Sequence, residues 1–123
     1  MNDETQNSVP RSIRESFDLT GRVAIITGGA GLLGCKHGEA VAEMRGLPIL
    51  VDLDKTKVES AAENIKKKYG SEALGWVADI TSQEAVEKLK VRIIEQFGRL
   101  DILINNAANN PSISSKAESS EQW

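Results

Sequence analysis

Four short runs of apolar residues are spaced along the chain, and longer segments of mixed apolar and polar positions separate them. The runs are continuous rather than alternating, which is typical of parallel strands that are buried on both faces. Each run therefore predicts an interior strand of a sheet. The predicted strands are Val23–Ile26, Ile49–Val51, Leu74–Ala78 and Ile102–Ile104.

Three helices are expected between these strands. The first covers about Leu32 to Arg45, and Gly46 is expected to close it at the C′ position. The other two are expected to begin with Thr-x-x-Glu capping boxes at Thr56 and Thr81, which satisfy free backbone N–H groups. Their apolar positions recur at helical spacing, and a glycine follows each helix. These positions are Val58, Ala61, Ala62 and Ile65 before Gly70, and Val86, Leu89, Ile93 and Phe97 before Gly98.

The order of the elements predicts the fold class. Strands that alternate with helices form βαβ units, and right-handed crossovers make the resulting sheet parallel. We therefore expect an α/β fold with a Rossmann-type, doubly wound parallel sheet that is incomplete and has the strand order 3-2-1-4.

The loop after the first predicted strand is rich in glycine. Gly28, Gly31 and Gly34 follow a buried strand and precede a helix, which is the context that a phosphate-binding loop needs. Residues without side chains allow a tight turn and a close approach of the backbone to a pyrophosphate. The helix N-terminus adds free N–H groups and a positive dipole end. A plain structural turn is the alternative reading of these glycines.

Asp52 extends this prediction to a dinucleotide. It ends the second strand and follows Gly28 by 24 residues, close to the spacing at which a carboxylate accepts hydrogen bonds from the adenosine ribose. Its charge would repel the 2′-phosphate of NADP, and neither Arg nor Lys directly follows it. The pattern favours NAD as the cofactor, and a solvated loop carboxylate is the alternative.

Further residues at the predicted strand ends complete a family pattern. The chain carries, in order, Thr27-Gly28-x-x-Gly31-x-x-Gly34, Asp52, Asp79-Ile80-Thr81 and Asn105-Asn106-Ala107-Ala108. From about Phe17 to Asn110 it resembles the short-chain dehydrogenase/reductase family. The resemblance implies an NAD(H)-dependent oxidoreductase that transfers hydride between alcohols and carbonyl compounds, represented here by its cofactor-binding part.

The resemblance also implies the roles of individual residues. Asp79 and Ile80 would hold the adenine ring, and the backbone of Gly31 and Leu33 would face the pyrophosphate and ribose. Asn106 and Ala107 would line the cofactor after the fourth strand. The candidate cofactor-binding residues are Gly28, Gly31, Leu33, Gly34, Asp52, Asp79, Ile80, Asn106 and Ala107.

Two features depart from the family pattern. The shorter branch of the family usually has its middle glycine where Leu32 stands, and the spacing found here is more typical of nucleotide-sugar epimerases and dehydratases. The Asn105-Asn106-Ala107 element favours the shorter branch.

The second departure concerns catalysis. The resemblance implies general acid/base catalysis by a Tyr that lies four residues ahead of a Lys. The chain has one tyrosine, Tyr69, and position 73 is Ala, so no catalytic residue is assigned.

The domain organisation follows from these expectations. Residues 1–16 are expected to form a mobile N-terminal arm, and residues 17–110 a dinucleotide-binding half-domain. Residues 111–123 would be a polar tail that starts a missing C-terminal half with the catalytic pair. The alternative is a non-catalytic dinucleotide-binding or interaction module that is complete at this length.

Composition limits the partners and the compartment. The net charge is −3, from 15 basic and 18 acidic residues, which favours neither nucleic acid nor an anionic membrane as a partner. The single cysteine, Cys35, and a polar N-terminus without a signal-peptide pattern favour the cytoplasm. His37 has no Cys/His/Asp cluster around it, so no metal site is expected. A homo-oligomer is expected for a longer parent, and self-association for this chain.

Overall fold

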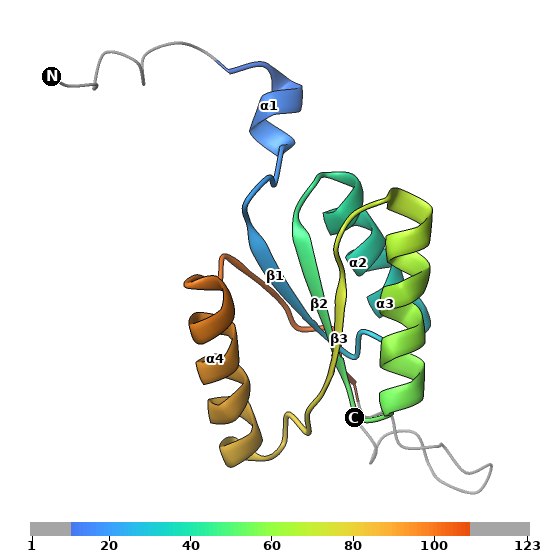
Figure 1. The fold of residues 1–123 in the computed structure, drawn as a ribbon, viewed down its shortest axis with the longest axis vertical. Helices are drawn as coiled ribbons and strands as arrows, with labels where there is room; N and C mark the ends of the chain where they lie inside the picture. Colours follow the sequence, from blue (N-terminus) through green and yellow to red (C-terminus); the bar gives the residue numbers. More distant parts are fainter. Residues whose placement is uncertain (1–10, 109–123) are drawn as a thin grey trace, which may run out of the picture.

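The computed structural model describes residues 11–108, so the predictions for residues 1–10 and for the tail at 111–123 lie outside it. Strands and helices alternate from β1 onward (Figure 1). The elements are α1 (Ile13–Phe17), β1 (Val23–Thr27), α2 (Leu32–Glu43), β2 (Leu47–Asp52), α3 (Lys55–Tyr69), β3 (Leu74–Val77), α4 (Gln83–Phe97) and β4 (Ile102–Ile104).

The four strands form one parallel sheet in the order β3-β2-β1-β4, which confirms the predicted fold class and strand order. β1 lies in the middle, where Ala24 is opposite Pro48 on one side and Ile102 on the other. All five residues of β1 are buried. A strand that is covered on both faces and paired on both edges has no exposed position, and this explains its continuous apolar run.

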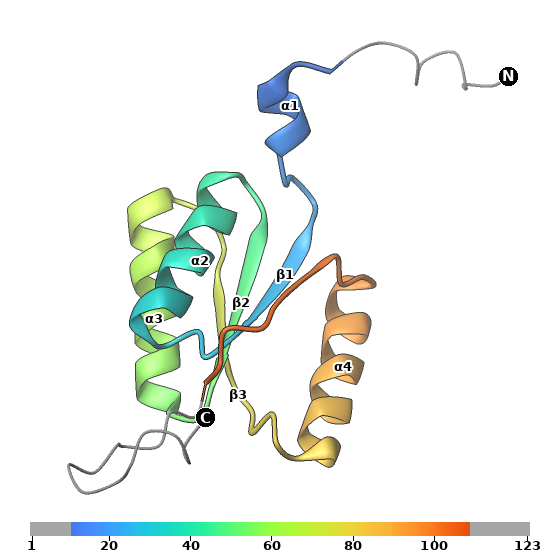
Figure 2. The same ribbon diagram turned by 180° about the vertical axis from the view of Figure 1, so that it is seen from behind.

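Helices cover both faces of the sheet. α2 and α3 pack on one face and α4 packs on the other, as the two opposite views in Figures 1 and 2 show. Alternate strand residues point to the two cores: Ile26 and Leu50 lie in the core beneath α2 and α3, and Ile25 and Ile49 in the core beneath α4. The apolar residues predicted for α3 are all buried.

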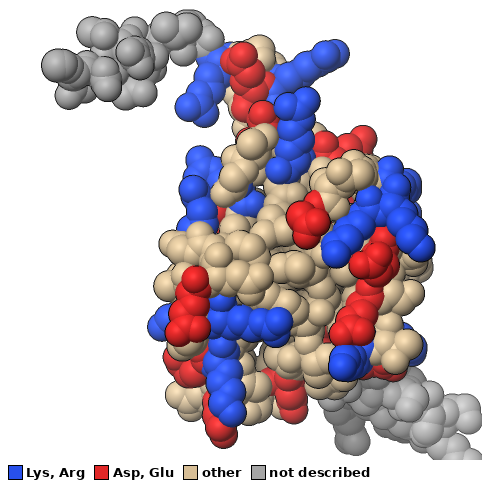
Figure 3. Space-filling model, in the orientation of Figure 1, with Lys and Arg blue, Asp and Glu red and all other residues tan. Residues whose placement is uncertain are grey.

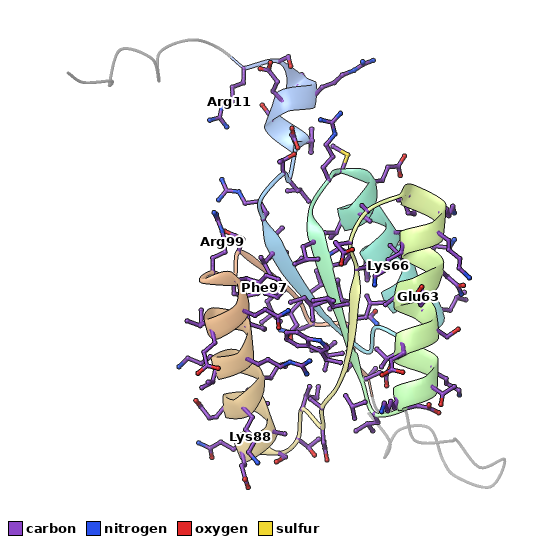
Figure 4. The ribbon with its side chains drawn as sticks, in the orientation of Figure 1. Arg11, Glu63, Lys66, Lys88, Phe97 and Arg99 are labelled. Carbon is purple, nitrogen blue, oxygen red and sulfur yellow. The ribbon has the colours of Figure 1, made fainter. Side chains whose placement is uncertain are left out.

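Aromatic contacts hold α4 on the sheet. The rings of Trp76 on β3 and Phe97 on α4 are stacked, with their centroids 6.4 Å apart. The guanidinium carbon of Arg92 lies 3.8 Å from the centre of the Trp76 ring, a distance suited to a cation–π contact. Figure 4 shows Phe97 on the side of α4 that faces the sheet. Of the apolar residues predicted for α4, Ile93 is buried but Val86 is exposed.

The predicted capping boxes of α3 and α4 are wrong. Asp54 caps α3 and Ser82 caps α4, and each side chain accepts the N–H of the third helical residue, at 3.1 and 3.2 Å. A better-placed cap precedes Thr56. The hydroxyl of Thr81 instead donates to the carboxylate of Asp79 at 2.6 Å. Several cap-forming residues in a row compete for the same helix end, and spacing alone does not separate them.

The end of α2 also differs from the prediction. The helix ends at Glu43, and Arg45 rather than Gly46 adopts the left-handed conformation, with φ of 71°. The N–H of Gly46 donates to the carbonyl of Val41 at 2.9 Å, as in a Schellman motif. Gly46 is needed for space, because a Cβ there would lie 2.8 Å from Val41 Cγ1 and 3.1 Å from Leu19 Cβ.

α1 adds one short helix to the segment that was expected to be an arm. The Ser12 hydroxyl accepts the N–H of Glu15, and the Glu15 carboxylate accepts the N–H of Ser12, both at 3.1 Å. α1 projects beyond the amino end of β1 in Figure 1, and Ile13 and Phe17 are exposed. Five residues are too few to produce an apolar period, so the pattern gave no sign of this helix.

Candidate functional site

An open groove of about 890 Å³ runs across the carboxyl ends of the strands. It includes the ends of β1 and β4, where the strand order reverses and where doubly wound sheets bind their ligands. All the predicted site residues except Gly34 line it. The lining residues are Gly28, Gly31, Leu32, Leu33, Val51, Asp52, Leu53, Ala78, Asp79, Ile80, Thr81, Asn106, Ala107 and Ala108.

The glycine-rich loop forms the floor of one side of the groove. Gly28 has φ of 64°, and a Cβ there would lie 2.9 Å from Ala107 Cα, so this position requires glycine. Gly31 is the N-cap of α2 and makes no side-chain cap hydrogen bond, whereas each other helix in residues 11–108 has such a bond. The first N–H groups of α2 therefore remain available to an anion in the groove.

Gly34 lies beneath the groove instead of lining it. It is buried in the first turn of α2. A Cβ at this position would overlap the carbonyl oxygen of Gly28 and lie 2.9 Å from Asn106 Nδ2. The absence of a side chain thus lets α2 pack directly on the loops after β1 and β4.

Thr27 joins the loops after β1 and β4, and the sequence interpretation did not select it as a site residue. Its hydroxyl oxygen accepts the N–H groups of Asn106 and Ala107, each at 3.1 Å. The Asn106 side chain in turn donates to the carbonyl of Gly28 at 3.2 Å. Thr27 is the one buried polar residue of the described chain. A hydroxyl directly before the first glycine was the available signal.

Asp52 contacts the glycine-rich loop as well as the groove. Its Oδ2 accepts the N–H of Ala30 at 2.9 Å, and its Oδ1 accepts the N–H of Leu53 at 2.8 Å. The side chain is half-buried. Asp52 is therefore bound to the loop after β1 although 22 residues separate it from Ala30.

The loop after β3 supplies a second carboxylate to the groove. Asp79 Oδ1 accepts the hydroxyl of Thr81 at 2.6 Å and its N–H at 2.9 Å. The hydroxyl bond, followed by the N–H bond, lowers the pKa of Asp79 below its usual range. Ile80 and Leu53 provide exposed apolar surface nearby. Among residues 11–108, the groove lining contains two carboxylates and neither Lys, Arg nor His.

Cys35 and Tyr69 add no reactive group to the groove. Burial, followed by the charge of Glu39, raises the pKa of the Cys35 thiol, which keeps it protonated and unreactive. Tyr69 ends α3, which runs antiparallel to the strands, so it lies toward the opposite end of the sheet from the groove. Ala73 is buried. Within residues 11–108, no cluster of three or more Cys, His, Asp or Glu side chains is placed to hold a metal ion.

A smaller cavity of about 310 Å³ lies at the amino ends of the strands. Two arginines that line it, Arg22 and Arg99, are paired with Asp101 at 3.3 and 2.7 Å. These ion pairs connect the start of β1 with the start of β4. None of the predicted site residues lines this cavity.

The fold and the groove define a Rossmann-type α/β domain. Residues 22–123 match the sequence profile of the family described as short chain dehydrogenase. The chain belongs to the short-chain dehydrogenase/reductase family. Within the described residues, no helix is long and apolar enough to cross a membrane.

Curated relatives of this chain are dehydrogenases or reductases. It is 33% identical to a short chain dehydrogenase/reductase of Aspergillus oryzae over 85% of this chain and 40% of the relative. It is 35% identical to a 12alpha-hydroxysteroid dehydrogenase of Clostridium sp. over 75% of this chain and 38% of the relative. The chain thus spans less than half the length of these relatives.

Two solved structures share the fold. NAD+-bound xylitol dehydrogenase superposes with a TM-score of 0.74 at 30% identity, over 85% of this chain and 40% of the other. L-sorbose reductase from Gluconobacter frateurii, in complex with NADPH and L-sorbose, gives a TM-score of 0.74 at 27% identity and the same coverage.

Proposed function

We propose that this chain is the cofactor-binding part of an NAD(H)-dependent oxidoreductase that interconverts alcohols and carbonyl compounds. The observation that supports the proposal is Asp52, which lies at the carboxyl end of β2 in a groove where none of the described lining residues is basic. Residues 17–110 would form the dinucleotide-binding half-domain. The catalytic Tyr and Lys, the substrate site and a homo-oligomeric interface would belong to a longer parent protein.

The residues of the groove fit a dinucleotide. The loop from Gly28 to Gly31 has little side-chain bulk, and the uncapped start of α2 offers N–H groups to a pyrophosphate. The bound nicotinamide would accept or donate the hydride. The pyrophosphate would be held by Gly28, Gly31 and Leu33, with Gly34 supporting this loop. Asp52 would accept hydrogen bonds from the ribose hydroxyls, and the adenine would be held by Asp79 and Ile80. The rest of the cofactor would be lined by Asn106 and Ala107.

The choice of NAD over NADP rests on charge. A 2′-phosphate bound beside the ribose would face Asp52, and the part of the groove lining that the structure describes offers no cation to balance it. Relatives with the same fold are complexed with NAD+ in one case and NADPH in another, so the family alone does not decide between them. Asp52, at the end of β2, is therefore the residue whose effect on the preference for NAD over NADP has to be tested.

Calorimetric titration of the purified chain with NAD+ and NADP+ tests this proposal. NAD+ is expected to bind more tightly, and Asp52→Ala should reduce the difference by about 1–3 kcal/mol, since a charged hydrogen-bond partner is lost. Asp54→Asn is the matched control, because it removes a carboxylate two residues away that caps α3 outside the groove. Equal or tighter binding of NADP+ to the wild-type chain would overturn the assignment of Asp52.

The parent protein is further proposed to be cytoplasmic, with NAD(H) and a small alcohol or carbonyl compound as its partners. The single cysteine supports a reducing compartment. In Figure 3, basic and acidic side chains are mixed over α3 and α4 on the face shown. Light scattering of the longer parent would test its oligomeric state, and a monomer would contradict the proposal.

A further inference from the structure

The end of β2 holds two consecutive N–H groups of the glycine-rich loop. The N–H of Gly29 donates to the carbonyl of Val51 at 3.0 Å. The next N–H, that of Ala30, donates to the Asp52 carboxylate at 2.9 Å. The contact between Gly29 and Val51 involves only backbone atoms, so a side-chain substitution leaves it in place. The contact of Ala30 depends on the Asp52 side chain, so replacing Asp52 by alanine removes it.

The position of Ala30 makes this contact important for the loop. Ala30 directly precedes Gly31, the N-cap of α2. Glycines on both sides of Ala30 give the backbone more freedom than other residues would, and ordering such a segment costs conformational entropy. The hydrogen bond to Asp52 orders Ala30, and with it the start of α2, before a ligand binds. Ligand binding then loses less conformational entropy, because less of the loop has to be ordered when the complex forms.

The Asp52 carboxylate has enough acceptor capacity to bind the loop and a ligand together. Each oxygen offers two lone pairs, and the structure uses one on each oxygen, for Ala30 and for Leu53. The carboxylate also lines the groove. We propose that Asp52 is a positioning residue for the pyrophosphate-binding loop, in addition to its ribose contact. The ligand part of this inference rests on the proposed function, whereas the contact with Ala30 does not.

A ligand without ribose hydroxyls separates the two roles. Adenosine diphosphate and its 2′,3′-dideoxy analogue both carry the pyrophosphate, but the analogue offers no hydroxyl to Asp52. If Asp52 positions the loop, Asp52→Ala weakens binding of the dideoxy analogue by about fivefold, the value of one net hydrogen bond. If Asp52 acts only on the ribose, Asp52→Ala leaves the affinity for the dideoxy analogue unchanged, and the inference is overturned.

The conservative variant Asp52→Asn guards against loss of folding in Asp52→Ala. Its amide oxygen can still accept the Ala30 N–H, so binding of the dideoxy analogue should recover toward the wild-type affinity. Loss of affinity in both variants to the same extent would contradict a positioning role. Asp54→Asn, which keeps the α3 cap and lies outside the groove lining, should bind both ligands like the wild-type chain.

Hydrogen exchange of the Ala30 amide tests the contact without any ligand. Exchange should be faster in Asp52→Ala and close to wild type in Asp52→Asn, with the Lys57 amide, which the Asp54 cap holds, as an unaffected reference. Unchanged Ala30 exchange in Asp52→Ala would overturn the inference. If the wild-type chain binds neither ligand, the proposed function fails, and Ala30 exchange still decides whether Asp52 orders the loop.

Discussion

The carboxylate of Asp101 accepts a hydrogen bond from the backbone N–H of Val23 at 2.8 Å, and the N–H of Asp101 donates to the carbonyl of Val23 at 2.9 Å. Arg99 adds two hydrogen bonds to this carboxylate, at 2.9 and 2.7 Å, and Arg22 adds one at 3.3 Å. The Arg99 bonds, followed by the Val23 bond, hold the pKa of Asp101 well below its usual range. An ionised carboxylate therefore ties the start of β4 to β1.

This arrangement predicts acid sensitivity. A carboxyl group whose pKa is lower in the folded than in the unfolded chain stabilises the fold above its unfolded pKa of about 3.9. That contribution is lost as the pH falls below about 4 toward the folded pKa. Urea unfolding of wild type and Asp101→Asn across this range measures it. The variant should be less stable at neutral pH, and the difference should shrink in acid. A difference that is independent of pH would contradict the assignment.

Thr27 predicts a second effect on stability. Thr27→Val removes the acceptor of the Asn106 and Ala107 N–H groups and keeps the side-chain shape. Leaving a buried donor unsatisfied costs about 1–3 kcal/mol, and because these two donors are only part-buried, the free energy of unfolding should fall by an amount toward the lower end of this range. Thr27→Ser keeps the hydroxyl and is the control. Chemical denaturation compares the two, and equal stability of Thr27→Val and Thr27→Ser would refute the role of the hydroxyl.

The fold could be predicted from the sequence because its main signals are long or repeated. The continuous apolar run of β1 and the βαβ order fix a parallel sheet, and the strand order follows from right-handed crossovers and family resemblance. The helix ends were harder to predict. Arg45 adopts a left-handed conformation that sequence rules reserve for glycine, because the backbone bonds of the Schellman motif and the packing at Gly46 determine the geometry together.

The site could be predicted as a set of positions but not as a set of contacts. Glycine spacing and Asp52 indicate the groove, because both lie at strand ends that a parallel sheet brings together. The bond from Ala30 to Asp52 and the packing of Gly34 against the Gly28 carbonyl depend on how two loops meet in space. The number of residues between two positions in the sequence does not determine how far apart they lie in the fold.

The position of Tyr69 predicts that this chain alone does not catalyse hydride transfer. Tyr69 lies toward the end of the sheet opposite the groove, and position 73 is a buried alanine in place of lysine. The purified chain should therefore not oxidise alcohols or reduce ketones with NAD(H) above background, measured by absorbance of NADH. Turnover that Tyr69→Phe abolishes would make Tyr69 catalytic. Turnover that survives this substitution would mean that another group is responsible.

The uncovered side of β4 is the basis of the last prediction. Leu103 is in register with Ile25 of β1, which places both side chains on the face that α4 covers. Yet Leu103 is 58% exposed while Ile25 is 5% exposed, and Ile94 on α4 is 48% exposed. Within the described residues, β4 pairs with β1 alone, so its other edge presents backbone groups beside apolar surface. Natural edge strands usually avoid this combination, because it promotes association.

We therefore expect the isolated chain to self-associate through β4. Leu103→Lys should shift the sedimentation velocity distribution toward monomer, because a charge on this surface opposes pairing at the edge. Two matched variants test other exposed apolar positions: Val77→Lys on the opposite edge strand, β3, and Ile13→Lys on α1. Neither should change the distribution. If the wild-type chain is a monomer with one sharp thermal transition, or if only Val77→Lys or Ile13→Lys disperses it, then β4 is not the associating edge.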